Sequence, residues 1–187
     1  MKISIVSFFL FWSVSLLVLG DDSKGLGGLP EVVVSDPSHN GLRVVARDNY
    51  LFLEGGNNSP LKLSEAFSTP DTDWRPTGAV LCSWSPNGKY LAVFAPHPRA
   101  TDVTFVDLRK MVVLPEVFPS NPNYPEWYNN VFSTQDSPGD WDGDKLKVTS
   151  NVTLRNGEKR TMQLQLVSNG TDFSMVMADA ENQNNGK

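Results

Sequence analysis

Three of the Asn-Gly pairs in this chain separate the runs of β-branched and aromatic residues in its middle and C-terminal parts, and they constrain its fold more than any other feature. The pairs are Asn87-Gly88, Asn156-Gly157 and Asn169-Gly170, and Asp142-Gly143 adds a fourth turn signal. Both residues of such a pair tolerate the left-handed backbone region that a two-residue hairpin loop requires. Each pair therefore predicts a tight turn between two antiparallel strands.

The runs beside these turns predict strands. They cover 31–34, 80–84, 90–95, 103–108, 111–114, 145–154, 160–167 and 173–178. No window of comparable length has apolar residues spaced by three and four, apart from a single turn at 63–67. We therefore expect an all-β, antiparallel fold in which most strands are linked to their neighbours by hairpins.

Strand composition separates the predicted interior from the predicted surface. Every residue in 90–95 is apolar, which indicates a strand that is covered on both faces. In 145–154 and 160–167 apolar residues alternate with Lys, Thr, Asn and Gln, which indicates one buried and one solvated face. We expect the C-terminal sheet to be an outer layer, packed on one side only against a middle sheet.

The N-terminal segment predicts export. After Lys2 the chain carries no charge until Asp21, and Gly20 precedes Asp21-Asp22, which is the pattern of a signal peptide at residues 1–20 cleaved after Gly20. A run of about 17 apolar residues also reaches the lower limit of a membrane span, so an uncleaved anchor is the alternative. We expect a secreted or periplasmic protein without membrane contact after cleavage.

The remaining chain has the length of one domain. Residues 21–42 are predicted to be a Gly-rich linker and a first strand, 43–178 a single all-β domain, and 179–187 a disordered polar tail. The formal net charge of −5 repels phosphate groups, so no nucleic acid partner is expected. Cys82 is the only cysteine, and its apolar setting predicts a buried, inert thiol.

One segment resembles a known repeat. Residues 83–92 read Ser-Trp-Ser-Pro-Asn-Gly-Lys-Tyr-Leu-Ala and are followed by a strand-like run at 102–108. Together they resemble one blade of the β-propellers found in the Tol system's periplasmic protein and in prolyl oligopeptidase relatives. In that family the Ser-Pro-Asp-Gly-Lys segment makes the turn between the first two strands of a blade, and the third strand ends near an Asp. Asn87 replaces the usual Asp, and the turn accepts it.

The resemblance covers about 26 residues, and it implies an architecture without implying an activity. Residues 48–53 and 61–63 resemble the outer strands of a preceding unit, and 140–148 resembles the start of a following one. The interval between Trp84 and Trp141 predicts a repeat of about 55 to 60 residues. Three units at most then fit, whereas a closed propeller needs four or more. We expect two or three propeller-blade-like sheets in an open stack, or alternatively a β-sandwich; a ring completed by self-association is the third option.

One acidic cluster is apparent. Asp140, Asp142 and Asp144 lie close together in the sequence, and Asp136 lies nearby. Their spacing differs from that of a calcium-binding EF-hand loop, which needs Gly at its sixth position and Glu at its twelfth. We interpret the cluster as a solvated hairpin turn, with Asp140, Asp142 and Asp144 as weak candidates for metal ligands. No cofactor is expected.

Signals for catalysis are sparse. The two histidines, His39 and His97, both lie in Pro-containing loops, where an exposed turn residue is the simplest interpretation. The chain has no Gly-x-Ser-x-Gly elbow, and two distant histidines with one cysteine do not suit a structural zinc site. We assign no catalytic residue.

The segment 114–130 is the predicted binding surface. Its four prolines prevent it from joining a sheet, and it contains Tyr124, Trp127 and Tyr128. Tyr and Trp provide large contact areas at low entropic cost. Trp74 lies in a similar connector. The alternative is that Trp127 and Tyr128 fold back and fill the gap between sheets.

The leading hypothesis is an exported, non-enzymatic β-protein that binds a protein or carbohydrate partner through loops at the sheet ends. A second hypothesis is a hydrolase of extracellular polysaccharide that uses carboxylates among Asp136, Asp140, Asp142 and Asp144. A third is a structural subunit of a homo-oligomer.

Overall fold

The computed structural model describes residues 31–35, 41–47, 50–63, 80–118 and 124–178. The predicted signal segment, the linker at 21–30, the tail, His39 and Trp74 lie outside these ranges, as does most of the expected turn at 63–67. The described part of the chain holds no helix with the length and hydropathy that a membrane crossing requires.

Twelve strands form three antiparallel sheets of four strands each, and none of the sheets closes on itself. In every sheet the spatial order of the strands follows the chain, as in a meander. The predicted all-β, open arrangement is confirmed.

Sheet 1 contains β1 (Glu31–Ser35), β2 (Arg43–Arg47), β3 (Tyr50–Glu54) and β4 (Leu61–Lys62). Sheet 2 contains β5 (Leu81–Trp84), β6 (Tyr90–Pro96), β7 (Thr101–Asp107) and β8 (Val112–Leu114). Sheet 3 contains β9 (Val131–Asp142), β10 (Lys145–Leu154), β11 (Lys159–Ser168) and β12 (Phe173–Met177).

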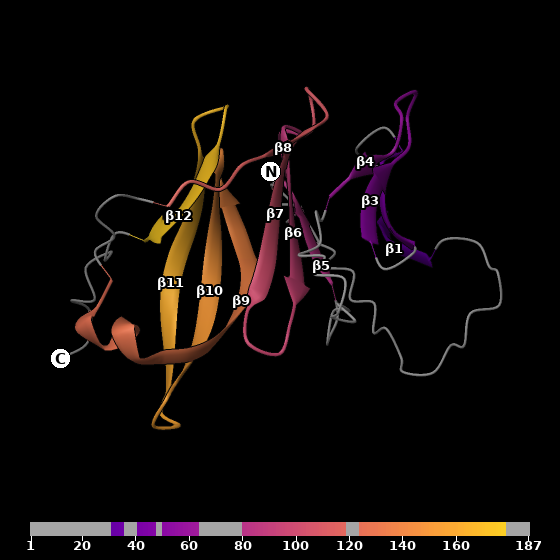
Figure 1. Cartoon of the computed structure of the whole chain (residues 1–187). Coiled ribbons are helices and arrows are strands. Elements are labelled where there is room, and N and C mark those ends of the chain that lie inside the picture. Colours follow the sequence, from indigo (N-terminus) through magenta and orange to yellow (C-terminus); the bar gives the residue numbers. More distant parts are fainter. Residues whose placement is uncertain (1–30, 36–40, 48–49, 64–79, 119–123, 179–187) are drawn as a thin grey trace, which may run out of the picture.

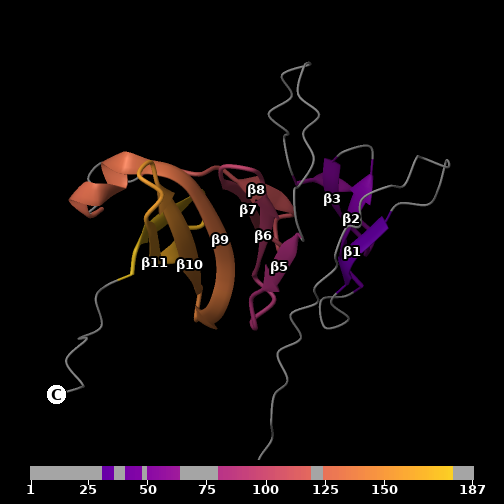
Figure 2. The ribbon, with the colours of Figure 1, turned by 90° about the horizontal axis from the view of Figure 1, so that it is seen from below.

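The sheets are stacked with sheet 2 in the middle, as the two views in Figures 1 and 2 both show. The central strand β6 explains why: Leu91, Val93 and Ala95 are buried against sheet 1, whereas Tyr90, Ala92 and Phe94 are buried against sheet 3. An apolar residue at every position is thus what a strand between two cores requires.

Sheet 3 is an outer layer, as predicted. On β10 and β11 buried apolar residues alternate with exposed or half-buried polar ones. Polar side chains pair across its outer face, where Thr149 donates to Gln163 and Thr161 donates to Asn151. The buried side chains of sheet 3 form one core with sheet 2, and their members are Trp141, Leu146, Val148, Val152, Leu154, Met162, Leu164, Leu166 and Phe173.

Backbone hydrogen bonds join sheets 2 and 3 at two separate places. After β8 the chain reaches the edge of β12, where the amide of Val117 donates to the carbonyl of Phe173 (2.7 Å) and the amide of Phe173 donates to Pro115 (3.0 Å). On β9, the amide of Thr134 donates to the carbonyl of Arg99 (2.9 Å). These bonds hold residues 115–117 against β12 and the first part of β9 against the β6–β7 loop.

Two sequence expectations need correction. In the Asn-Gly pairs only the glycines have positive φ, at 65° for Gly88, 84° for Gly157 and 93° for Gly170. The asparagines do not, because the loops are not the two-residue type that places both residues in the left-handed region. In the β5–β6 loop, for example, Gly88 donates its amide to the Ser85 carbonyl, and Ser85 pairs with Tyr90 across four intervening residues.

The repeat length is the second correction. The first strands of the three sheets begin at Glu31, Leu81 and Val131, so the units repeat every 50 residues rather than every 55 to 60. Trp84 and Trp141 both lie at or near the end of a first strand, but β5 has 4 residues and β9 has 12. The longer β9 made the interval between the two tryptophans exceed the true period.

Candidate functional site: the connector between sheets 2 and 3

The predicted aromatic residues lie together, and they are half-buried. A short 3-10 helix, η1 (Glu126–Asn130), carries Trp127 and Tyr128, and Tyr124 stacks on Tyr128 with ring centroids 4.4 Å apart. All three side chains pack against the core of sheets 2 and 3. The guanidinium of Arg160 lies 4.9 Å from the centroid of Trp127 and occupies part of its surface. These aromatic residues therefore help to close the end of the core, as the alternative interpretation expected.

Other residues of the same region are exposed. The large apolar side chains exposed in the described part of the chain lie on β8, on the segment after it and at the start of β9, and they are Val112, Val113, Val117, Phe118 and Phe132. Val117 lies beside Phe173 at one end of sheet 3, whereas Phe132 lies near the opposite end, where Val131 pairs with Leu154. Phe118 is 77% exposed, Phe132 52% and Val117 48%. We call the adjacent residues Val117 and Phe118 the connector surface. Neighbouring exposed apolar side chains are typical of an interaction site.

Beside this surface lies a group of three carboxyl side chains, which we call the carboxyl cluster. Asp102 lies on β7, Glu116 on the segment after β8, and Asp136 on β9. Burial raises the pKa of each carboxyl, and repulsion from Asp102 and Asp136 raises the pKa of Glu116 further. Within the described residues, none of the three forms an ion pair with Lys or Arg, and Asp136 Oδ1 is buried without a hydrogen-bond partner.

The titratable groups that the structure describes next to the carboxyl cluster supply no positive charge that would balance its negative charge. Burial lowers the pKa of His97, although Asp102 partly opposes that effect, so the imidazole is neutral at neutral pH. Burial also raises the pKa of Tyr124 and of Tyr128, with smaller contributions from the carboxylates. A hydrogen bond from Ser150 partly counteracts the rise in the pKa of Asp136.

Asp136→Asn is expected to raise the melting temperature at pH 7. The pKa of Asp136 is raised in the folded state, so the folded chain binds the proton more tightly than the unfolded chain does. The free energy of unfolding therefore falls as the pH rises through the folded pKa. An amide keeps the acceptor for Ser150 and carries no charge. Thermal unfolding followed by circular dichroism should show the gain at pH 7 and its disappearance near pH 3, where the parent carboxyl is also neutral.

Asp140→Asn is the matched control, because the Asp140 side chain is exposed on the same strand. It should leave the melting temperature unchanged at both pH values. A lower melting temperature of Asp136→Asn at pH 7 would show that the ionised carboxylate stabilises the fold, which would contradict the expected increase.

Asp136 does not converge with the other acidic residues singled out from the sequence. Asp140 and Asp142 are exposed at the end of β9, and Asp136 lies four residues away along the strand, or about 13 Å at 3.3 Å per residue. That exceeds the separation of about 5 to 10 Å between paired glycosidase carboxyls. No group of three or more His, Cys, Asp or Glu side chains in the described ranges is arranged to hold a metal ion.

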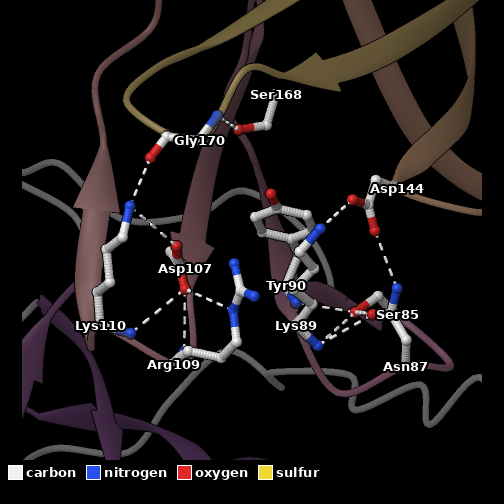
Figure 3. Close-up of polar contacts among 10 residues, drawn as sticks. All are labelled: Ser85, Asn87, Lys89, Tyr90, Asp107, Arg109, Lys110, Asp144, Ser168 and Gly170. Carbon is white, nitrogen blue, oxygen red and sulfur yellow. Dashed lines mark hydrogen bonds and ion pairs between the residues drawn. The ribbon is translucent and has the colours of Figure 1, made fainter.

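Asp144 instead joins two hairpins (Figure 3). It accepts hydrogen bonds from Lys89 and, at 2.9 Å, from the amide of Asn87, and both contacts lower its pKa. Ser85 organises the same turn, since its hydroxyl accepts from the backbone amides of Lys89 (3.0 Å) and Tyr90 (2.8 Å). The Asp144 contacts thus connect the tip of the β5–β6 hairpin to the tip of the β9–β10 hairpin.

A second group of polar contacts, around Asp107, lies beside the Asp144 contacts in Figure 3. The buried carboxylate of Asp107 accepts from the backbone amides of Arg109 (3.0 Å) and Lys110 (3.2 Å), and these bonds lower its pKa against the opposing effect of burial. Lys110 also donates to the carbonyl of Gly170 at 2.7 Å, in the β11–β12 loop. The bond between Lys110 and Gly170 is therefore a second side-chain contact between sheets 2 and 3 at this end.

Comparison of the chain with protein-family models, with curated proteins and with solved structures finds no match to any of them. The evidence for function comes from the site itself. Cys82 adds no reactive group, because burial raises the pKa of its thiol to about 12 and the side chain packs against the core of sheets 1 and 2.

The binding surface predicted from the sequence lies in the same segment as Val117 and Phe118, but the prediction named the half-buried aromatic residues of that segment. It did not name Phe118, Glu116 or Asp102. The signal for Phe118 was available, because a phenylalanine next to a proline in a connector has no strand or helix in which to be buried. No local signal marked Asp102 or Glu116, since their proximity to Asp136 arises only when β7, β9 and the connector come together.

Proposed function

We propose that this chain is an exported, non-enzymatic binding protein that contacts a partner protein through the connector surface. The observation that carries the proposal is that Val117 and Phe118, adjacent in the chain beside the edge of β12, both expose a large apolar side chain. The outer faces of β10 and β11 carry mainly polar side chains instead.

A protein partner is favoured over a glycan by the chemistry of the exposed residues. Val and Phe offer apolar contact without a hydrogen-bonding group. The Tyr and Trp side chains that suit a sugar ring are instead half-buried against the core. The stacking of Tyr124 on Tyr128 and the contact of Arg160 with Trp127 further reduce the ring surface left for a sugar.

Phe118→Ser is expected to reduce partner capture by at least about tenfold, because an exposed aromatic anchor at the centre of an interface contributes about 2 kcal/mol or more. The measurement is a quantitative pull-down from the exported fraction of the source cells, with the captured protein identified by mass spectrometry. Phe118 is 77% exposed, so the substitution should leave the melting temperature unchanged.

Thr161→Ala on the outer face of sheet 3 is the control and should capture as much partner as the parent chain. Equal capture by Phe118→Ser and the parent would remove the connector surface from the proposal. Retention of a glycan by the parent chain, abolished in Trp127→Ala, would favour a carbohydrate partner instead.

A further inference from the structure

The backbone that carries the connector surface is hydrogen-bonded to the edge of β12. We call residues 115–118 the strap, because they run from the end of β8 to the edge of β12. Hydrogen bonds from Val117 to Phe173 and from Phe173 to Pro115 hold its backbone at two points. Val117 and Phe118 are thus presented to solvent on a backbone that is already ordered, which lowers the entropic cost of binding.

Among the residues that the structure describes, no Lys or Arg forms an ion pair with the negative charge of the strap. Glu116 lies directly before the two exposed apolar residues, and Asp102 and Asp136 repel it. The guanidinium of Arg99 lies 5.3 Å from the ring centroid of Phe132 and makes no ion pair with the carboxyl cluster among the described residues. A ligand that supplies a positive charge at Glu116 would relieve this repulsion.

Resting on the proposed function, we infer that the strap binds a segment of a partner protein in which apolar side chains are combined with Lys or Arg. The apolar side chains cover Val117 and Phe118, and the cation pairs with Glu116. A symmetric contact between two copies of this chain fits less well, because it would bring two Glu116 carboxylates together. Nucleic acids and anionic membranes are repelled by the same charges.

Three fluorescent octapeptides test the inference with the full chain. They alternate Val with Lys, with Ser or with Glu, so they share apolar content and differ in charge. Fluorescence anisotropy should show that the Lys peptide binds at least tenfold more tightly than the Glu peptide, with the Ser peptide between them. Raising the salt concentration should narrow this difference.

Glu116→Lys should reverse the order, so that the Glu peptide binds best. Glu158→Lys, the same charge change on the exposed β10–β11 loop, should leave the order unchanged. Circular dichroism establishes that both variants are folded.

Failure of this inference is distinguishable from failure of the proposed function. Equal binding of the three peptides, reduced equally by Phe118→Ser, would overturn the charge preference and leave the apolar surface in place. Binding of no peptide would also overturn the inference, whereas the proposed function depends on capture of the partner in the pull-down.

Discussion

Phe105→Ala is expected to lower the free energy of unfolding by about 3–5 kcal/mol, the usual cost of removing a fully buried phenylalanine. The Phe105 ring is completely buried on β7. Its centroid lies 5.1 Å from that of Tyr90 in sheet 2, and 6.0 Å and 5.5 Å from those of Trp141 and Phe173 in sheet 3. The substitution therefore opens a cavity where the two sheets meet. Urea unfolding followed by circular dichroism measures the loss.

Phe132→Ala is the matched control, since that ring is 52% exposed. It should change the free energy of unfolding by less than about 0.5 kcal/mol. A loss below about 1 kcal/mol in Phe105→Ala would contradict the packing of sheets 2 and 3 described above.

Gly55→Ala is expected to destabilise the chain by more than about 2 kcal/mol. Gly55 follows β3 with φ of 116°, a region that other residues avoid. A Cβ atom there would lie 2.3 Å from the carbonyl oxygen of Gly41, which is backbone and cannot rotate away. The strain falls on sheet 1, so the same urea titration should report an earlier transition.

A substitution at the adjacent Gly56 distinguishes the penalty of a positive φ from the clash with the Gly41 backbone. Gly56 also has positive φ, at 61°, but a Cβ atom would meet nothing within 4 Å. Gly56→Ala should therefore cost only the left-handed backbone penalty of about 1 kcal/mol. Equal losses in the two variants would show that the approach of Gly41 contributes nothing.

Most of the strands were predictable because their pattern is local, although β2 and most of β9 were not predicted. The unbroken apolar run of β6 indicated a strand between two cores, and the alternation in β10 and β11 indicated an outer sheet. Both follow from the period of two in a strand, which needs no knowledge of the neighbours. The bounds of β10 were predicted without error, and those of β6 differ from the prediction only by Pro96.

The candidate site was less predictable because it is built from distant residues. The carboxyl cluster needs β7, β9 and the connector to be in place, and no spacing in the sequence encodes their proximity. Likewise, prolines and aromatic residues indicated that residues 114–130 would form a surface connector, but they did not show that Trp127 would turn towards the core while Phe118 would not. The exposure of each side chain depends on which sheet edge the backbone follows.

The order of strands within each sheet bears on how the chain reaches its native state. Every strand pairs with its neighbour in sequence, so ordering each sheet closes only short loops, which favours rapid folding. Each sheet can form as soon as its own 50 residues are available. Strand β6, however, is apolar on both sides and gains its full burial only after the sheets before and after it have formed. The middle of the molecule is thus the last part to be shielded from water, and it is the part most open to aggregation until the C-terminal strands arrive.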